Sequence, residues 1–142
     1  PDPESRPPAS MSSLAPRHVL GTLRETYTRE AGLDHIAAVR DDPALYEDGR
    51  IANAAWLLRR ANYVLADNVK LGPWIHVESD INMHSLLRDG EELEVRAVVA
   101  ENVDTKGHLM VVLDVQMLSA ERAIMTCRHW AIYEPRQVRQ TR

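Results

Sequence analysis

Two adjacent acids and an amide stand where an apolar stretch of the chain begins, and these residue types can do acid–base chemistry. Glu47 and Asp48 come directly before the run that opens at Gly49, and Asn53 follows at its start. A carboxylate can take a proton from water when burial raises its pKa toward neutrality. Free backbone N–H groups at a helix start can hold a carbonyl oxygen, and an amide can add a donor. The structural alternative is that the acids cap the helix and complement its dipole, with Asn53 facing solvent or a partner.

Other polar side chains fall on predicted strands. Four of them share one strand face by strict alternation: His76, Glu78, Asp80 and His84. One His-x-Glu pair provides too few ligands for a metal, so we expect a polar outer face with ion pairs and no metal site. His129 has the parity of inward positions and is expected to be a hydrogen-bonded core histidine. Cys127 is expected to be a small buried side chain, because no neighbouring positive charge would activate its thiol.

Composition narrows the class of protein. The chain has 142 residues, a net charge of −4 and a single cysteine. Its length suits one domain, its charge gives no reason to expect nucleic acid, and one cysteine excludes an internal disulfide and favours a cytoplasmic location. No apolar run is long enough to span a membrane, and no signal-peptide core is present. The sequence opens without Met, which fits either Met removal or a piece of a longer chain.

A long helix over residues 51–69 must position the acids and the amide, because this stretch contains no Gly or Pro and is rich in helix formers. Apolar residues recur at spacings of three and four on one face: Ile51, Ala54, Ala55, Leu58, Ala61, Leu65 and Val69. The opposite side also carries Trp56, Leu57, Tyr63 and Val64. We therefore expect a helix that is buried on most of its circumference.

Four strands are predicted after this helix, near residues 74–83, 93–99, 109–117 and 123–133, because apolar and polar residues alternate there. Short connections between the last three favour antiparallel neighbours. An α+β fold follows, in which a long antiparallel sheet wraps around the central helix. Apolar residues on the other sheet face, such as Trp130, indicate a second contact surface.

The N-terminal region differs in composition from the rest of the sequence. Residues 1–13 are rich in Pro and Ser and predict a flexible arm or linker, followed by a single domain over 14–137 and a frayed tail at 138–142. Pro16 and the apolar spacing after it predict an extra N-terminal helix over residues 16–30. Residues 33–39 fit a short strand or a helical turn equally well.

This layout resembles the hot-dog fold, in which a sheet wraps one long helix. The matching segments are DGRIANAAWLL, GPWIHVESDI, LLRDGEELEVRAVV, KGHLMVVLDVQML and HWAIYEP, which together span roughly residues 44–135. The first is similar to the helix entry of hot-dog acyl-CoA thioesterases. The third is similar to a strand entry shared by hot-dog thioesterases and MaoC-like hydratases.

The resemblance implies an acyl-thioester ligand carried by CoA or acyl carrier protein, a second hot-dog unit as homo-oligomer or tandem half, and no cofactor. It implies a site at the helix entry, where Asp48 and Glu47, the acids closest to the helix start, and Asn53 are the candidate catalytic residues. The implied substrate contacts are Gly49, Arg50, Trp56 and Arg60, the last with Arg59 suited by charge to CoA phosphates.

The catalytic signatures of the fold are not intact. Arg50 stands where the thioesterase pattern has His, and Tyr46 stands where it has its catalytic Asp. The second thioesterase entry, H-G-G, is replaced by residues 52–54, and the hydratase signature D-x-N-P-x-H is absent. The sequence therefore predicts a thioesterase-like hydrolase, with two alternatives: a catalytically silent hot-dog subunit or an enoyl-CoA hydratase-like protein.

Overall fold

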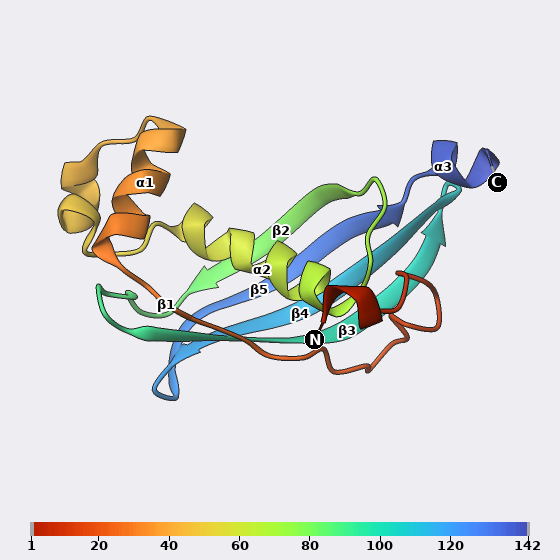
Figure 1. The fold of residues 1–142 in the computed structure, drawn as a ribbon, viewed down its shortest axis with the longest axis horizontal. Helices are drawn as coiled ribbons and strands as arrows, with labels where there is room; N and C mark the ends of the chain where they lie inside the picture. The colour runs from red at the N-terminus through yellow and green to blue at the C-terminus, as the bar shows by residue number, and fades with distance from the viewer. Residues whose placement is uncertain (1, 142) are drawn as a thin grey trace.

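The computed structural model describes residues 2–141 and contains one five-stranded antiparallel sheet and one long helix packed across it (Figure 1). The strands are β1 (Leu23–Thr26), β2 (Ile75–Met83), β3 (Glu92–Thr105), β4 (His108–Ser119) and β5 (Arg122–Glu134). The helices are α1 (Arg29–Val39), α2 (Ala54–Asn68) and α3 (Arg136–Gln140), with 3-10 segments η1 (Pro3–Ser5) and η2 (Pro43–Gly49). The sheet order is β1-β3-β4-β5-β2. The predicted α+β class and the four predicted strands are confirmed.

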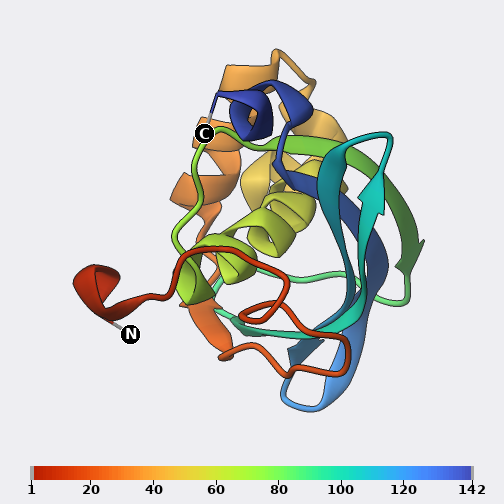
Figure 2. The same cartoon turned by 90° about the vertical axis from the view of Figure 1, so that its right-hand side faces the viewer.

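The sheet curves around α2 and covers one side of it (Figure 2). Leu57, Ala61, Val64 and Leu65 of α2 are fully buried. They pack in one apolar core with inward residues of β3, β4 and β5, among them Val95, Val111, Leu113, Val115, Met117 and Met125. The alternation along these strands sends every second side chain to α2, which is the period expected of a half-buried sheet.

The predicted core face of α2 is partly wrong. Ala54 and Ala55 are exposed and Leu58 is only half-buried, whereas Trp56 and Leu57 belong to the core. The helix is apolar on most of its surface, so the spacing of apolar residues did not reveal which side the sheet covers. One side of α2 is left partly open.

The helix predicted over residues 16–30 is also wrong. Residues 23–26 form β1, which pairs with β3 in the register Leu23↔Val95 to Thr26↔Glu92. The N-terminal helix is α1, which begins after Thr28, whose Oγ1 accepts from the backbone N–H of Ala31 at 3.2 Å. Pairing with the free edge of β3 satisfies backbone groups in a way that local helical spacing does not reveal.

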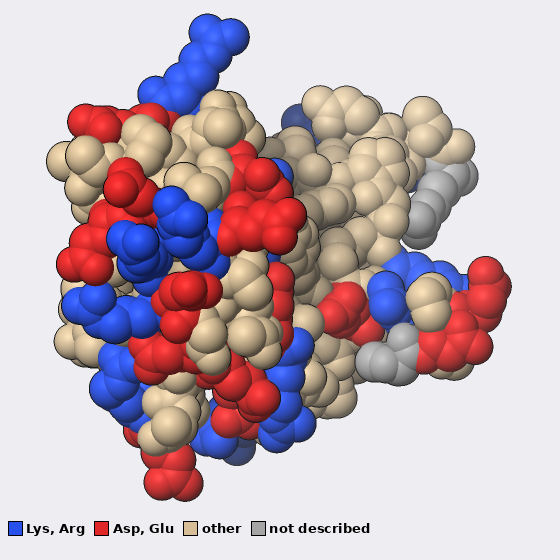
Figure 3. All heavy atoms as spheres, turned by 60° about the vertical axis from the view of Figure 1, so that its left-hand side comes forward, with Lys and Arg blue, Asp and Glu red and all other residues tan. Residues whose placement is uncertain are grey.

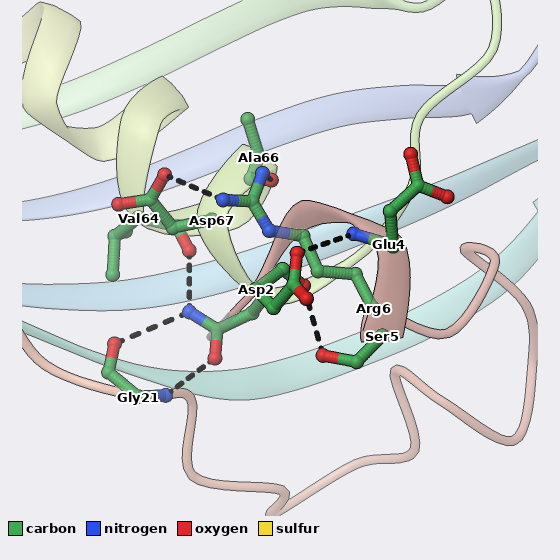
Figure 4. Close-up of polar contacts among 9 residues, drawn as sticks. Asp2, Glu4, Ser5, Arg6, Gly21, Val64, Ala66 and Asp67 are labelled. Atoms are coloured by element: carbon green, nitrogen blue, oxygen red, sulfur yellow. Dashed lines mark hydrogen bonds and ion pairs between the residues drawn. The ribbon is translucent and has the colours of Figure 1, made fainter.

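Residues 2–13, predicted to be a flexible arm, contact the C-terminal end of α2 (Figure 4). Arg6 donates to the carbonyl of Ala66 at 2.9 Å, and the backbones of Pro7 and Ala9 bond to that of Lys70 at 2.8 and 3.0 Å. Of the predicted tail, residues 138–140 belong to α3, where Arg139 forms an ion pair with Asp104 at 2.7 Å. Residues 1 and 142 lie outside the described part of the chain.

Two surface features bear on function. β2 is an edge strand, and Ile75, Val77 and Met83 on it are exposed. Figure 3 shows Lys and Arg interspersed with Asp and Glu over the end that carries α1 and η2, without a large area of one sign in this view. Within residues 2–141 no helix is both long enough and apolar enough to cross a membrane.

Candidate functional site

The two acids expected to act at the helix start lie on an exposed turn. Glu47 and Asp48 adopt left-handed backbone conformations, with φ of 46° and 54°, inside η2. The Glu47 carboxylate pairs with Arg88 at 3.3 Å, and the Asp48 carbonyl accepts from Arg29 Nε at 2.9 Å. Helix α2 begins only at Ala54. The turn therefore separates both acids along the chain from the free N–H groups of α2.

Gly49 is required by the backbone at this turn. It has φ of 88° and is buried, and an added Cβ would lie 2.8 Å from Leu33 Cγ. Its carbonyl accepts from the buried Tyr27 hydroxyl at 2.7 Å. Burial, reinforced by the charge of Asp89, raises the pKa of Tyr27. Arg50, the next expected contact, is exposed.

Asn53 caps α2 and contacts an acid that the sequence analysis did not select. Its Oδ1 accepts from the N–H of Ala55 at 2.7 Å, and its Nδ2 lies 3.4 Å from Asp41 Oδ2. Asp41 also accepts from the Tyr46 hydroxyl at 2.8 Å. The Tyr46 hydrogen bond, followed by one from the Asp42 backbone, lowers the pKa of Asp41. An ionised carboxylate of low pKa is a poor proton acceptor at neutral pH, so this group is better suited to orient neighbours.

An apolar hollow of about 550 Å³ lies where η2, the start of α2 and the end of β2 meet. Its wall is mostly apolar and includes Leu45, Ile51, Ala54, Met83 and Leu86, with Tyr46, His84 and Ser85 as polar members. Leu45, Met83 and Leu86 are exposed large apolar residues. Its volume falls in the range typical of small-molecule sites, and its wall suits an aliphatic group.

Trp56 and Arg60, both expected to contact substrate, are buried and contact each other and neighbouring residues of the protein. Arg60 is 7% exposed, binds both carboxylate oxygens of Glu25 at 2.9 and 3.0 Å and donates to the Trp56 carbonyl at 2.9 Å. Its guanidinium lies 3.3 Å from the centroid of the Trp56 ring, which packs edge-on against Tyr27. These contacts join α2 to β1 and leave both side chains with partners inside the protein.

A second group of polar residues forms a hydrogen-bonded chain between β2, β5 and α2. His129 is fully buried, as expected, and its Nε2 donates to Asn62 Oδ1 at 2.7 Å. Burial, with the nearby His76, lowers the pKa of His129 to about 4, so its ring is neutral at pH 7. A neutral ring carries one hydrogen, so His129 Nδ1 must accept from the Ser79 hydroxyl, 2.8 Å away.

The same reasoning assigns the donor and acceptor roles of His76, the last residue of this hydrogen-bonded series. Because the Ser79 hydroxyl donates to His129, its oxygen accepts from His76 Nε2 at 2.7 Å. The Nδ1 atom of His76 is left without a hydrogen-bond partner among the described residues. His76 also stacks on His129, with ring centroids 4.3 Å apart.

The position of His76 corrects the predicted strand face. A β-bulge between His76 and Glu78 interrupts the alternation, so His76 lies on the face of Ser79 and His129, which it contacts, although the residue is exposed, as are Glu78 and Asp80. The sequence carries no sign of the bulge, because Val77 fits the alternating pattern. Ser79 and Asn62 were also missed, because their roles depend on hydrogen bonds to His129 on strand β5.

His35 of α1 is a further residue that the sequence analysis missed. It is 6% exposed, and neither ring nitrogen has a hydrogen-bond partner among the described residues. Burial lowers the pKa of His35, and the charges of Arg59 and Arg60 lower it further. A buried polar group without a partner costs about 1–3 kcal/mol. Such a group in a pocket wall is a candidate for contact with a ligand.

Cys127 is 5% exposed, and burial raises the pKa of its thiol to about 11. The prediction of a buried, unreactive thiol is confirmed, since the thiolate is the nucleophilic form. No group of three or more metal-binding side chains in residues 2–141 is placed to hold a metal ion.

Comparison with known proteins supports the architecture. No family model matches the chain, and no curated protein matches it by sequence. Among solved structures, a monoamine oxidase regulatory protein from Archaeoglobus fulgidus is 16% identical, with a TM-score of 0.73 over 92% of this chain and 97% of that one. A MaoC-like dehydratase from Rhodospirillum rubrum is 14% identical, with a TM-score of 0.69 over 89% and 98%. One chain of the 3R-hydroxyacyl-ACP dehydratase complex HadBC from Mycobacterium tuberculosis is 18% identical, with a TM-score of 0.68 over 81% and 94%.

These likenesses and the sheet wrapped around α2 define the chain as a hot-dog fold protein, and the hot-dog fold expected from the sequence is confirmed. At identities this low, the likeness establishes the fold alone.

Proposed function

We propose that this chain is a hydratase-like hot-dog subunit that binds the acyl group of a CoA or acyl-carrier thioester. The observation that carries the proposal is the apolar hollow of about 550 Å³ at the start of α2. Two of the three similar structures are named as dehydratases, so we prefer hydratase-like chemistry to the thioesterase-like hydrolysis expected from the sequence. We also propose a cytoplasmic location, because a single cysteine favours a reducing compartment.

The proposal includes a second hot-dog unit. The free edge of β2 exposes backbone groups along nine residues together with the apolar side chains of Ile75, Val77 and Met83. An edge of this length commonly pairs with another strand. Met83 also lines the hollow, so a unit that paired with β2 would lie beside the bound acyl group. The similar HadBC protein is itself a complex.

A binding role with acid–base groups supplied by the second unit fits this site better than self-sufficient catalysis. Hydration needs a group that takes and returns a proton near neutral pH. Asp41, which accepts from the hydroxyl of the hollow residue Tyr46 at 2.8 Å, has a lowered pKa. The wall residue His84 is already bonded through Nε2 to the Thr126 hydroxyl at 2.8 Å. We therefore infer that the chain binds substrate and that its partner completes the chemistry.

Calorimetric titration with butyryl-CoA, octanoyl-CoA and free CoA tests the binding site. We expect the acyl-CoAs to bind more tightly than free CoA, because only they place an aliphatic chain in the hollow. Leu86→Glu puts a charge in the wall and should weaken acyl-CoA binding at least about tenfold, or 1.4 kcal/mol. Val19→Glu is the matched control, since Val19 is also exposed and lies outside the hollow. Equal affinities for acyl-CoA and free CoA would contradict the proposal.

Sedimentation equilibrium and an enoyl-CoA hydration assay test the partner. We expect the chain to self-associate or to require an added hot-dog unit, and to hydrate enoyl-CoA only in the completed assembly. A soluble monomer that hydrates enoyl-CoA by itself would overturn the partner proposal. The catalytic role expected of Asp48 stays a prediction, and Asp48→Asn in the active assembly checks it: full activity would remove Asp48 from the site.

A further inference from the structure

A second pocket, of about 380 Å³, lies between α1, α2 and the start of β2. It shares no lining residue with the apolar hollow, and the function proposed above does not use it. The residues that matter for its chemistry are His35, Val39, Leu58, Arg59, Asn62 and His76.

The polar atoms of this pocket are short of partners. His35 is 6% exposed, and both of its ring nitrogens lack hydrogen-bond partners among residues 2–141. Asn62 uses its Oδ1 to accept from His129, which leaves its NH2 group without a bond in the described chain. His76 uses Nε2 on Ser79, which leaves its Nδ1 unbonded. Three side chains from three elements that line one cavity therefore carry unsatisfied groups: the Asn62 NH2 group is a donor, His76 Nδ1 is an acceptor because Nε2 holds the hydrogen, and both His35 nitrogens are buried in the wall.

The charge of the pocket is also uncompensated. Arg59 is exposed and has no ion pair or hydrogen bond within the described residues, in contrast to Arg60, which is held by Glu25. No acid lines the pocket. Asp41 acts on His35 electrostatically, but its carboxylate is already bonded to Tyr46 and Asn53. The pocket thus offers one free cation, Arg59, and N–H donors from Asn62 and His35.

The remaining wall is apolar. Leu58 is half-buried, and Val39 is an exposed apolar residue of α1. Ala38 and Ala55 complete this side. A ligand that satisfies both halves of the pocket has one negatively charged oxygen group and a short aliphatic body.

We propose that this pocket binds the carboxylate of a small aliphatic acid. The guanidinium of Arg59 pairs with the carboxylate, and the Asn62 NH2 group and the His35 N–H donate to its oxygens. The aliphatic part packs on Leu58 and Val39. Phosphate fits less well, because it carries more charge than one free cation balances and has no apolar part. This site does not depend on the acyl-thioester function.

Titration of the full chain with butyrate, acetate and inorganic phosphate at pH 7 tests the site, with NMR of labelled histidine rings as the readout. We expect butyrate to shift the ring signals of His35 and His76 in a saturable manner, with a Kd on the order of 1 mM. Acetate should bind more weakly than butyrate, and phosphate more weakly still.

Variants locate the binding. Arg59→Gln should weaken butyrate binding at least about tenfold. Because Arg59 is exposed, this variant should unfold at the same midpoint as the native protein. Arg24→Gln is the control, since it removes an exposed arginine of β1 and changes the net charge equally. Butyrate that leaves the His35 signals unmoved, phosphate that binds more tightly than butyrate, or an Arg59→Gln variant with native affinity would each overturn the proposal.

Discussion

Replacement of Arg60 by Ala should destabilise the fold strongly, although the sequence suggested a role in substrate binding. The guanidinium is 7% exposed, bonds twice to Glu25 and once to the Trp56 carbonyl, and stacks on the Trp56 ring. Removal of one partner from a buried ion pair typically costs about 3–5 kcal/mol. The Glu25 side chain is 37% exposed, so water can partly solvate the carboxylate that is left.

We therefore expect a loss of about 2–4 kcal/mol, which is about 1 kcal/mol less than for a fully buried pair because Glu25 is partly solvated. For a domain of this size, that corresponds to a fall in Tm of about 5–15 °C. The assay is urea unfolding followed by tryptophan fluorescence, in parallel with thermal unfolding. Arg59→Ala is the matched control, because this neighbouring arginine is exposed and should change stability by less than about 0.5 kcal/mol.

A double-mutant cycle separates the ion pair from the loss of packing. Glu25→Ala combined with Arg60→Ala should show a coupling energy above about 1 kcal/mol, because the two side chains share two hydrogen bonds. If Arg60→Ala were as stable as Arg59→Ala, or the coupling were near zero, the interpretation of Arg60 as a core anchor would be refuted.

Three other perturbations test the fold. Leu57→Ala should cost about 2–5 kcal/mol and Leu58→Ala clearly less, since only Leu57 is fully buried; equal losses in a urea titration would contradict the assigned core face. Gly49→Ala should cost about 1–3 kcal/mol through its positive φ and the contact with Leu33, measured as a fall in Tm. The pKa of His129 falls from about 6.5 in the unfolded state to about 4 on folding, so between these pH values the unfolded state gains the proton and the folded state does not. Its stabilising contribution is complete above about pH 6.5 and is lost as the pH falls toward 4; His129→Gln should flatten this part of the stability–pH curve, and an unchanged curve would refute the assignment.

The sequence by itself determined the architecture around α2. The absence of Gly and Pro over residues 51–69 and the alternation in the last four strands were enough to predict a sheet wrapped around one helix, because these signals depend only on local periodicity. The inward direction of His129 and the burial of Cys127 followed from the same alternation.

Only the tertiary structure decided the details that make the candidate sites. β1 formed in place of a predicted helix because the edge of β3 was available to pair with it. The bulge after His76 placed that ring on the same face as Ser79 and His129, and its stacking on His129 joins residues about fifty positions apart. Arg60 became a core residue because Glu25 lies opposite it on β1. Each of these outcomes depends on which distant segment lies beside a residue, and local spacing carries no information about that choice.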